Sequence, residues 1–185
     1  PRFPVKKLLK SLRLSPLGDA AVYAEFCDTL DLKLNQGLQA LAAALRARRL
    51  PWIRDVVPAL CGIAVHFDPD HAELPAPVLA YAGELLQECF KSASKFANSG
   101  RFVELPVCYD SVFGLDIEEI ASSTKIPVEK IIQLHSSPDH LVLMVGFSPG
   151  QPYIGGLDPK LALPRRATPR TRVPAGSVAI ANAQT

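Results

Sequence analysis

Four arginines in the last part of the chain have the residue type and spacing best suited to chemistry. They are separated by proline, threonine and alanine: Arg165, Arg166, Arg170 and Arg172. Proline fixes the backbone φ angle and stiffens a loop, which holds each guanidinium group in a set direction. A rigid guanidinium can donate two parallel hydrogen bonds to a carboxylate or a phosphate. The pattern therefore indicates an anion-binding loop.

The charge of this segment favours the same interpretation. After Asp158 there are five basic residues, including Lys160, and no acidic residue, although the net charge of the chain is only +2. A cationic segment on a mildly acidic body favours an anionic partner, such as a phosphate, a carboxylate or an acidic protein surface. A solvated basic loop is the alternative. Glycines and prolines expected to shape the loops flank the arginines: Pro149, Gly150, Gly155, Gly156, Pro174 and Gly176.

Among the four histidines, His135 has the position that best suits catalysis. It ends an expected helix just before an apolar strand, where it could face the later Gly/Pro-rich loops, so it is the candidate acid or base. A hydrogen-bonded structural histidine is the alternative. The polar cluster Asp68, Asp70, His71 and Glu73 matches no known ligand spacing, so we expect no metal site.

Motifs of a self-sufficient enzyme are absent from the sequence. There is no P-loop, no G-x-G-x-x-G after a strand and no G-x-S-x-G nucleophile elbow. Ser177 has no neighbouring base and is expected to be structural. A helix pair around Lys125 has the outline of a helix-turn-helix, but its second helix carries Glu129 beside a single cation, so we expect no nucleic-acid partner. The chain alone does not look like a complete hydrolase.

Composition places the protein among globular chains. Its 185 residues are 48% apolar and 21% charged. The longest uncharged apolar run, 56–65, is too short to span a bilayer, and the basic stretch 1–10 leads into no apolar signal segment. Four widely spaced cysteines are expected to be reduced, buried thiols: Cys27, Cys61, Cys89 and Cys108. We therefore expect a cytoplasmic protein with no membrane partner.

Hydrophobic periodicity predicts two successive strand–strand–helix units in the first ninety residues. The expected strands are 12–14, 21–26, 53–57 and 63–67. The first expected helix has a leucine stripe at spacings of four, three and four residues: Leu34, Leu38, Leu41 and Leu45. The second expected helix covers 79–90. Together these elements predict a small α/β sandwich as an N-terminal domain, residues 1–95.

The small polar stretch 91–100 is expected to link this domain to a second one, residues 100–185. The second domain is predicted to contain strands at 102–109, 140–147 and 177–181. Two short helices are expected between the first two of these strands, at 117–123 and 128–135.

Four segments of the chain resemble the KipI / allophanate hydrolase subunit 1 family. They are L-S-P-L-G-D-A-A-V at 14–22, G-F-S-P-G-Q-P-Y-I-G-G-L-D at 146–158, P-R-R-A-T-P-R-T-R-V-P-A-G-S-V-A-I at 164–180, and Q-T at 184–185. The resemblance covers most of residues 12–185. It implies an α+β protein whose second domain is a cyclophilin-like β-barrel without prolyl isomerase activity. Family members continue beyond Q-T, so we expect the barrel to be truncated at Thr185.

The family includes one component of the bacterial ATP-dependent 5-oxoprolinase. The resemblance therefore implies a subunit of a multi-subunit enzyme that hydrolyses 5-oxo-L-proline to L-glutamate with ATP, inactive as an isolated chain. The implied partners are a C-type subunit with a similar barrel fold and an A-type subunit of the lactam-utilisation kind. Within the matching motifs, candidate substrate- or anion-binding residues are Tyr153, Arg165, Arg166, Arg170 and Gln184.

Two other roles known in this family remain open. One is a regulatory protein that resembles KipI and inhibits a histidine kinase. The other is a component related to urea amidolyase or allophanate hydrolase, although the sequence has no biotin-attachment or amidase motif.

Overall fold

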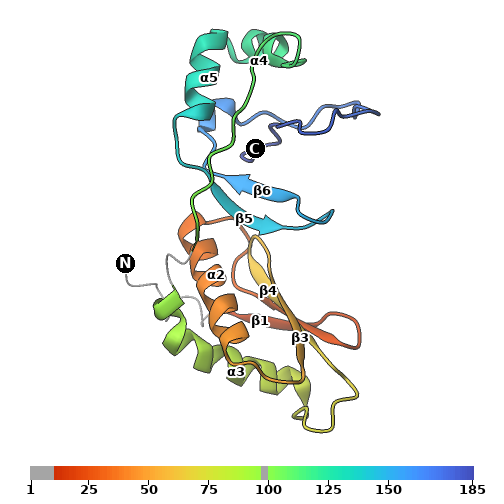
Figure 1. Ribbon diagram of the computed structural model, residues 1–185. Coiled ribbons are helices and arrows are strands. Elements are labelled where there is room, and N and C mark those ends of the chain that lie inside the picture. Colours follow the sequence, from red (N-terminus) through yellow and green to blue (C-terminus); the bar gives the residue numbers. More distant parts are fainter. Residues whose placement is uncertain (1–10, 97–99) are drawn as a thin grey trace. The chain divides into compact units, whose positions relative to one another are not determined.

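The computed structural model describes residues 11–96 and 100–185 (Figure 1). The chain divides into two compact units, Pro1–Arg101 and Phe102–Thr185, and each is described by itself. The basic stretch 1–10 and positions 97–99 of the expected linker lie outside the described residues.

A four-stranded antiparallel sheet and two long helices build the first unit. In sheet order its strands are β1 (Arg13–Pro16), β2 (Ala21–Glu25), β4 (Gly62–Phe67) and β3 (Ile53–Pro58). Helix α2 (Leu32–Ala47) connects β2 to β3, while α3 (Val78–Ala93) and the short helix η1 (Ser94–Phe96) follow β4. The two strand–strand–helix repeats predicted from periodicity are confirmed.

Local sequence explains where α2 begins and which side of it is buried. The side chain of Asp31 accepts a hydrogen bond from the backbone N–H of Leu34 at 3.0 Å, which caps the helix. Leu38, Leu41 and Leu45 follow at helical spacing and are each at most 1% exposed. This stripe is the face that α2 turns toward the core.

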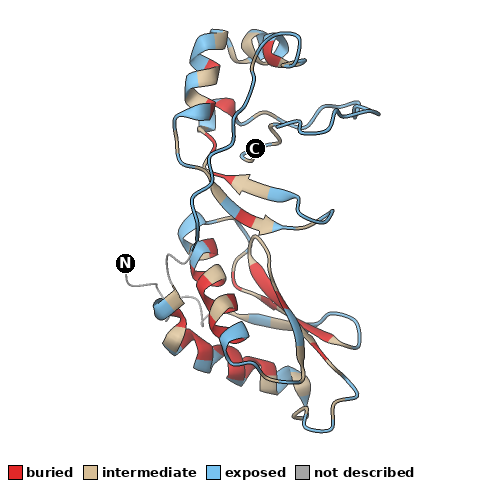
Figure 2. Ribbon diagram, in the orientation of Figure 1, coloured by how far each residue is buried: buried red, intermediate tan, exposed pale blue. Residues whose placement is uncertain are grey.

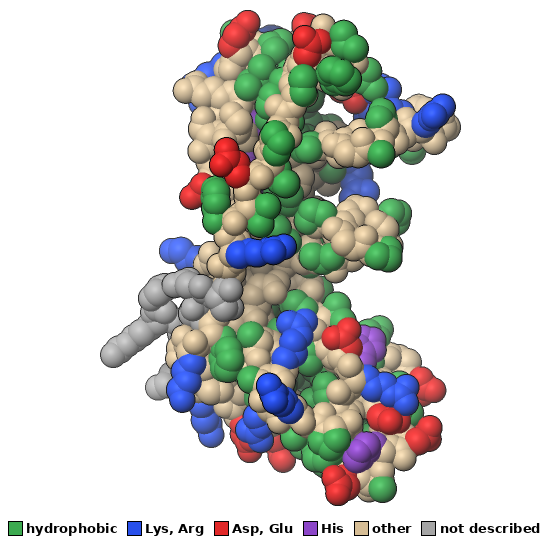
Figure 3. All heavy atoms as spheres, viewed as in Figure 1, with side chains coloured by type: hydrophobic (Ala, Val, Ile, Leu, Met, Phe, Trp, Pro, Cys, Tyr) green, Lys and Arg blue, Asp and Glu red, His purple; other side chains and the backbone are tan. Residues whose placement is uncertain are grey.

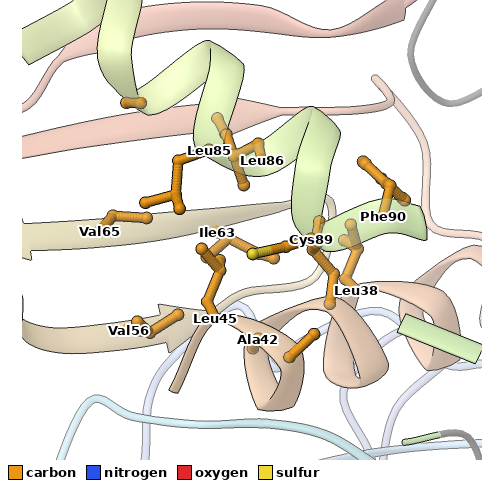
Figure 4. Packing of buried hydrophobic residues seen from close by; sticks show 14 of the residues in the cluster. Leu38, Ala42, Leu45, Val56, Ile63, Val65, Leu85, Leu86, Cys89 and Phe90 are labelled. Atoms are coloured by element: carbon orange, nitrogen blue, oxygen red, sulfur yellow. The ribbon is translucent and has the colours of Figure 1, made fainter. Parts of the chain in front are cut away.

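Alternating side chains of the two central strands contribute to the same core. Ala24 on β2 and Ile63 and Val65 on β4 are at most 1% exposed and belong to one cluster with the apolar residues of both helices. Alternate residues of a strand share one face of the sheet, so α2 and α3 cover the same face. Figure 4 shows this packing, and Figure 2 shows that α2, α3 and the sheet carry most of the buried positions of this unit.

The buried amide of Asn35 ties α2 to the connection between β3 and β4. Asn35 is 0% exposed, and its Nδ2 donates to the carbonyl oxygens of Ala59 and Leu60 at 3.1 and 3.2 Å. Backbone carbonyls in a tight connection need such partners when they are removed from water. Asn35 therefore fixes this turn against the helix.

The second unit contains two short helices and a two-stranded ribbon. The helices are α4 (Ile117–Thr124) and α5 (Val128–Ser136), both near their predicted ranges. Strands β5 (Leu141–Val145) and β6 (Pro152–Gly155) pair antiparallel, and the 3-10 helix η2 (Pro159–Leu161) contacts α5. A small core joins α5 to η2 and to the residue Leu157 before it: Ile131, Leu157 and Leu161. Residues of α4 pack against this core.

No closed barrel is present among residues 100–185, which the structure describes in full. The sheet of this unit consists of β5 and β6, and the expected strands at 102–109 and 177–181 are not strands. Phe102 and Leu105 are 78% and 64% exposed. Alternating apolar residues favour an extended chain, but a strand needs a partner for its backbone groups. No ladder forms on either stretch, and the pairing of 177–181 is limited to an isolated bridge between Ala181 and Gln184. Figure 3 shows hydrophobic side chains on the surface of this unit.

The expected linker at 91–100 is helical over residues 91–96. Residues 91–93 complete α3 and residues 94–96 form η1. Phe90 and Ala93 are 3% and 4% exposed, so core packing continues the helix through a stretch whose small polar residues predicted a linker.

The cysteines are free, but they are not all buried as expected. Cys89 is buried, Cys27 and Cys61 are half-buried, and Cys108 is exposed because it lies in the unpaired stretch 102–109. Burial, together with contact with the Cys61 thiol, raises the pKa of Cys27 to about 12. Cys27 is therefore a protonated thiol near neutral pH.

Candidate functional site

The last turn of α5 places His135 at the centre of a hydrogen-bonded cluster. His135 is 8% exposed. Its Nδ1 lies 2.6 Å from the hydroxyl oxygen of Tyr109, and its Nε2 lies 2.7 Å from Oγ1 of Thr185. Both ring nitrogens are therefore occupied by hydroxyl groups, each of which can donate or accept a proton.

A second imidazole lies beside His135. His140 is hydrogen-bonded through Nε2 to the backbone oxygen of His135 at 2.6 Å, and the two ring centroids are 5.6 Å apart. The Nδ1 of His140 is buried without a hydrogen-bond partner among the described residues. Burial, and secondly the charge of His140, lowers the pKa of His135 below its ordinary value.

Burial also raises the pKa of the Tyr109 phenol. At neutral pH the pair is therefore a neutral imidazole and a protonated phenol. Such a pair can pass a proton between a ring nitrogen and a hydroxyl, which is the requirement for acid–base catalysis. The candidate predicted from sequence, His135, thus has suitable neighbours, while Tyr109, His140 and Thr185 were not predicted as site residues.

The C-terminal strand-like segment brings Thr185 to this cluster. Ile154 in β6 and Thr185 exchange two backbone hydrogen bonds, at 3.0 and 3.2 Å. Gln184 precedes Thr185 and is half-buried, and Tyr153, also half-buried, lies opposite Met144 in the ribbon. Tyr153 and Gln184 therefore lie near the residues that deliver Thr185 to His135.

The arginine loop, defined here as residues 164–174, contacts the start of α4. Nη1 of Arg166 donates to Oδ1 of Asp116 at 3.1 Å and to Oε2 of Glu119 at 2.6 Å. Nη2 of Arg170 donates to the same Oδ1 of Asp116. The hydrogen bond to Glu119, followed by the charges of Glu119 and Asp116, raises the pKa of Arg166.

Tertiary structure thus supplies acids that the tail itself lacks. Asp116 and Glu119 lie about fifty positions earlier in the sequence, so sequence-local charge counting could not pair them with the arginines. The sequence feature that could have indicated this contact is the acidic run at the start of α4, which is opposite in charge to the tail. Arg165 and Arg172 are exposed and make no ion pair with any described residue.

Three of the four glycines expected to shape these loops have the positive φ that glycine allows. Gly150 in the β5–β6 hairpin and Gly156 after β6 have φ of +82° and +93°. Gly176 has φ of +80°, in the turn where Ser177 N–H donates to the carbonyl of Pro174 at 3.2 Å. Gly155 is a buried residue of β6, and Pro149 precedes Gly150 at the hairpin tip.

Other kinds of site find little support in the described part of the chain. Its residues contain no group of three or more His, Cys, Asp or Glu side chains placed to hold a metal ion. None of its helices has the length and apolar character needed to cross a bilayer.

A pocket of about 200 Å³ between the β1–β2 turn and the start of α3 is lined mainly by apolar groups, including Val22, Phe67 and Val78. It lacks the convergent polar groups of a catalytic site.

Comparison with known proteins gives a consistent set of relatives. The family model described as carboxyltransferase domain, subdomain C and D, matches residues 12–185. The chain is 32% identical over 179 residues to the B subunit of 5-oxoprolinase from Bacillus subtilis (strain 168), covering 94% of this chain and 75% of that protein. It is 34% identical to the 5-oxoprolinase B subunit of Haemophilus influenzae, covering 94% and 78%. The Escherichia coli O157:H7 protein of the same name is 33% identical over 170 residues, covering 91% and 74%.

Solved structures resemble the chain in fold. The crystal structure of TTHA0988 in space group P212121 matches with a TM-score of 0.73 and 33% identity, covering 89% of this chain and 31% of that one. The present chain thus spans about a third of that protein. Kluyveromyces lactis urea carboxylase matches at 15% identity and a TM-score of 0.50, over 80% of this chain and 15% of that one, which is a likeness of fold alone.

Proposed function

Since the chain belongs to the family of the carboxyltransferase domain, subdomain C and D, we propose that it acts as one component of a multi-subunit 5-oxoprolinase. The observation that carries this proposal is the identity of 32 to 34% to three proteins named as the B subunit of 5-oxoprolinase. These matches extend over at least 91% of the chain. They therefore include both compact units rather than one shared segment.

In the proposed reaction, ATP drives the opening of the 5-oxoproline lactam. The γ-phosphoryl group moves to the amide oxygen and ADP leaves. One water then attacks the activated carbon and the ring C–N bond breaks, its nitrogen taking up a proton, which leaves the acyl phosphate of glutamate. A second water cleaves this acyl phosphate to glutamate and inorganic phosphate. Negative charge develops on phosphoryl and carbonyl oxygens along this route, so the site needs cationic donors.

The arginine loop is the proposed source of these donors. Arg165 and Arg172, which form no ion pair within the described residues, can bind the substrate carboxylate or a phosphoryl group. The sequence has no P-loop to hold a nucleotide by itself. We therefore assign the ATP site to the assembled complex, with the arginine loop as one contributor.

His135 is the proposed acid or base of this site. Its lowered pKa keeps the imidazole neutral near pH 7, so one ring nitrogen can accept a proton. Because both nitrogens already bond to hydroxyls, a proton would reach solvent or substrate through Tyr109 or Thr185. Tyr153 in β6 and Gln184, the neighbour of Thr185, are proposed to contact the lactam.

The proposed partners are a C-type subunit of similar barrel fold and an A-type subunit of the lactam-utilisation kind. The exposed apolar stretch 102–115 supports an interface between chains, because six of its large apolar residues are each more than half exposed: Phe102, Val103, Leu105, Val112, Phe113 and Leu115. We further propose that the first unit is a two-layer α/β sandwich and that β5 and β6 belong to a cyclophilin-like barrel. The complex is proposed to be cytoplasmic.

The test is reconstitution. The purified chain and its two proposed partners are assayed separately and together for ATP-dependent release of glutamate from 5-oxoproline. Activity that requires all three chains supports the proposal. Robust turnover by this chain alone would contradict the shared site, and failure of the three chains to associate or turn over would contradict the assigned function.

A further inference from the structure

We infer that Asp116 and Glu119 are positioning residues, whose carboxylates hold the arginine loop against the start of α4 so that Arg165 and Arg172 are left to bind the anionic ligand. This inference rests on the proposed function, because it assigns separate roles to the arginines of the loop that we propose to bind an anion. It differs from that assignment for Arg166 and Arg170, which become parts of a clamp.

The contacts of the clamp form a connected network. Oδ1 of Asp116 accepts hydrogen bonds from both Arg166 and Arg170, and Arg166 also donates to Glu119. An isolated ion pair on a protein surface contributes little, because water and salt screen it and two long side chains must be ordered. Shared carboxylates order several groups at once, and here they connect two points of the loop to one helix end.

The position of Asp116 gives an independent reason to assign it this role. It is the N-cap residue of α4, where an aspartate commonly accepts a hydrogen bond from a backbone N–H of the first turn. Asp116 makes no such capping bond. Its carboxylate instead accepts hydrogen bonds from the guanidinium groups of Arg166 and Arg170. The contact with the distant loop therefore takes the place of the capping bond.

The loop is suited to being fixed at two points. Pro164 and Pro169 restrict its backbone, so anchoring Arg166 and Arg170 also limits the positions of the intervening and adjacent residues. Arg165 lies next to one anchor and Arg172 two positions beyond the other. Neither has an ion-pair partner among the described residues, so their charges remain available to an anion such as a carboxylate or phosphoryl group.

Proteolysis of the full chain tests the clamp without relying on enzyme activity. Trypsin can cleave after each arginine of the loop, and the double variant Asp116→Asn/Glu119→Gln leaves all four arginines in place. If the clamp holds the loop, cleavage within 165–172, identified by mass spectrometry, should be roughly five- to thirtyfold faster in this variant. The melting temperature is measured in parallel to show that the variant is folded.

Glu118 provides the matched control, because it lies in the same helical turn, is exposed and makes no ion pair with a described residue. Glu118→Gln should be cleaved at the wild-type rate. The conservative variants Asp116→Glu and Glu119→Asp, which keep the charge, should remain within about twofold of it. Equal cleavage of the wild type and the Asp116→Asn/Glu119→Gln variant would overturn the clamp.

Kinetics of the reconstituted complex then test positioning. The Asp116→Asn/Glu119→Gln variant and Arg165→Ala should each lower kcat/KM by on the order of tenfold, while Glu118→Gln leaves it unchanged. A rise in the KM for 5-oxoproline identifies the anion as the substrate carboxylate, and an effect on the KM for ATP or on kcat identifies a phosphoryl group. Unchanged kinetics in the clamp variant would overturn positioning, whereas an inactive wild-type complex would refute the proposed function and leave the proteolysis result standing.

Discussion

At the scale of single residues, the neighbours of a side chain decide its chemistry more than its type does. His135 is buried between the hydroxyls of Tyr109 and Thr185 and beside a second imidazole. These surroundings favour the neutral ring, because a positive charge there would lose solvation and meet the charge of His140.

The lowered pKa of His135 predicts how stability depends on pH. The unfolded chain binds this proton below the ordinary histidine value of 6.5, while the folded chain resists it until a lower pH. The contribution of the neutral ring to the free energy of unfolding is therefore fully present above pH 6.5. It is lost as the pH falls toward the pKa of His135 in the folded chain, by at most about 1.4 kcal/mol per pH unit. The melting temperature should accordingly fall as pH drops from about 7 to 5.

The variant His135→Gln removes this titrating group and should flatten that fall, even if its stability at neutral pH is lower. Gln133→Asn, on the same helix, removes no titrating group; it is the control and should keep the wild-type slope. Thermal unfolding followed by circular dichroism across this pH range makes the comparison. Identical profiles for the wild type and His135→Gln would contradict the assignment.

At the scale of elements, α4 and α5 show how a short connection sets the geometry of a site. Lys125 ends α4 in the left-handed conformation, with φ of +58° and ψ of +31°. Glycine is the usual residue there, because a side chain at positive φ is strained. The turn at Lys125 sends the chain into α5, which carries His135, while the other end of α4 holds the arginine loop.

Replacing Lys125 by glycine should therefore stabilise the protein. Relief of the left-handed strain outweighs the added freedom of the unfolded chain, for a net gain of about 0.5–1 kcal/mol in the free energy of unfolding. Chemical denaturation measures this difference. Lys130→Gly, placed inside α5, is the matched control and should cost up to about 1 kcal/mol. A loss of stability in Lys125→Gly would show that the lysine side chain contributes more than its backbone costs.

At the scale of the whole molecule, the two units differ in how far they bury their apolar residues. The first unit has a continuous cluster formed by α2, α3 and the sheet. The second has a three-residue buried cluster and many exposed apolar side chains. A cooperative fold requires enough buried apolar surface to offset the lost chain entropy, and the first unit meets this requirement within its own residues.

A fragment of residues 1–101 is therefore predicted to fold alone. It should show one cooperative thermal transition, because the residues that pack in its core all lie within it. Circular dichroism and one-dimensional NMR spectra of the fragment and the full chain provide the measurement. A fragment without a cooperative transition would mean that its core depends on residues 102–185.

Sequence by itself determined the elements whose signals are local. The leucine stripe of α2, the alternation in β2 and β4 and the helical ranges of α4 and α5 predicted structure because each depends on neighbours a few positions away. The motifs of residues 146–185 likewise indicated the family through residue types and spacing alone. His135 was selected because it ends a helix before an apolar strand.

Only the tertiary structure decided which distant groups meet. Tyr109 and Thr185 reach His135 across 26 and 50 positions, and Asp116 reaches Arg170 across 54. Hydrophobic periodicity in the sequence cannot predict such pairs, because they depend on the path of the whole chain. For the same reason the apolar stretch 102–109 predicted a strand that the structure does not contain: a strand depends on a distant partner, and local residue types cannot say whether one arrives.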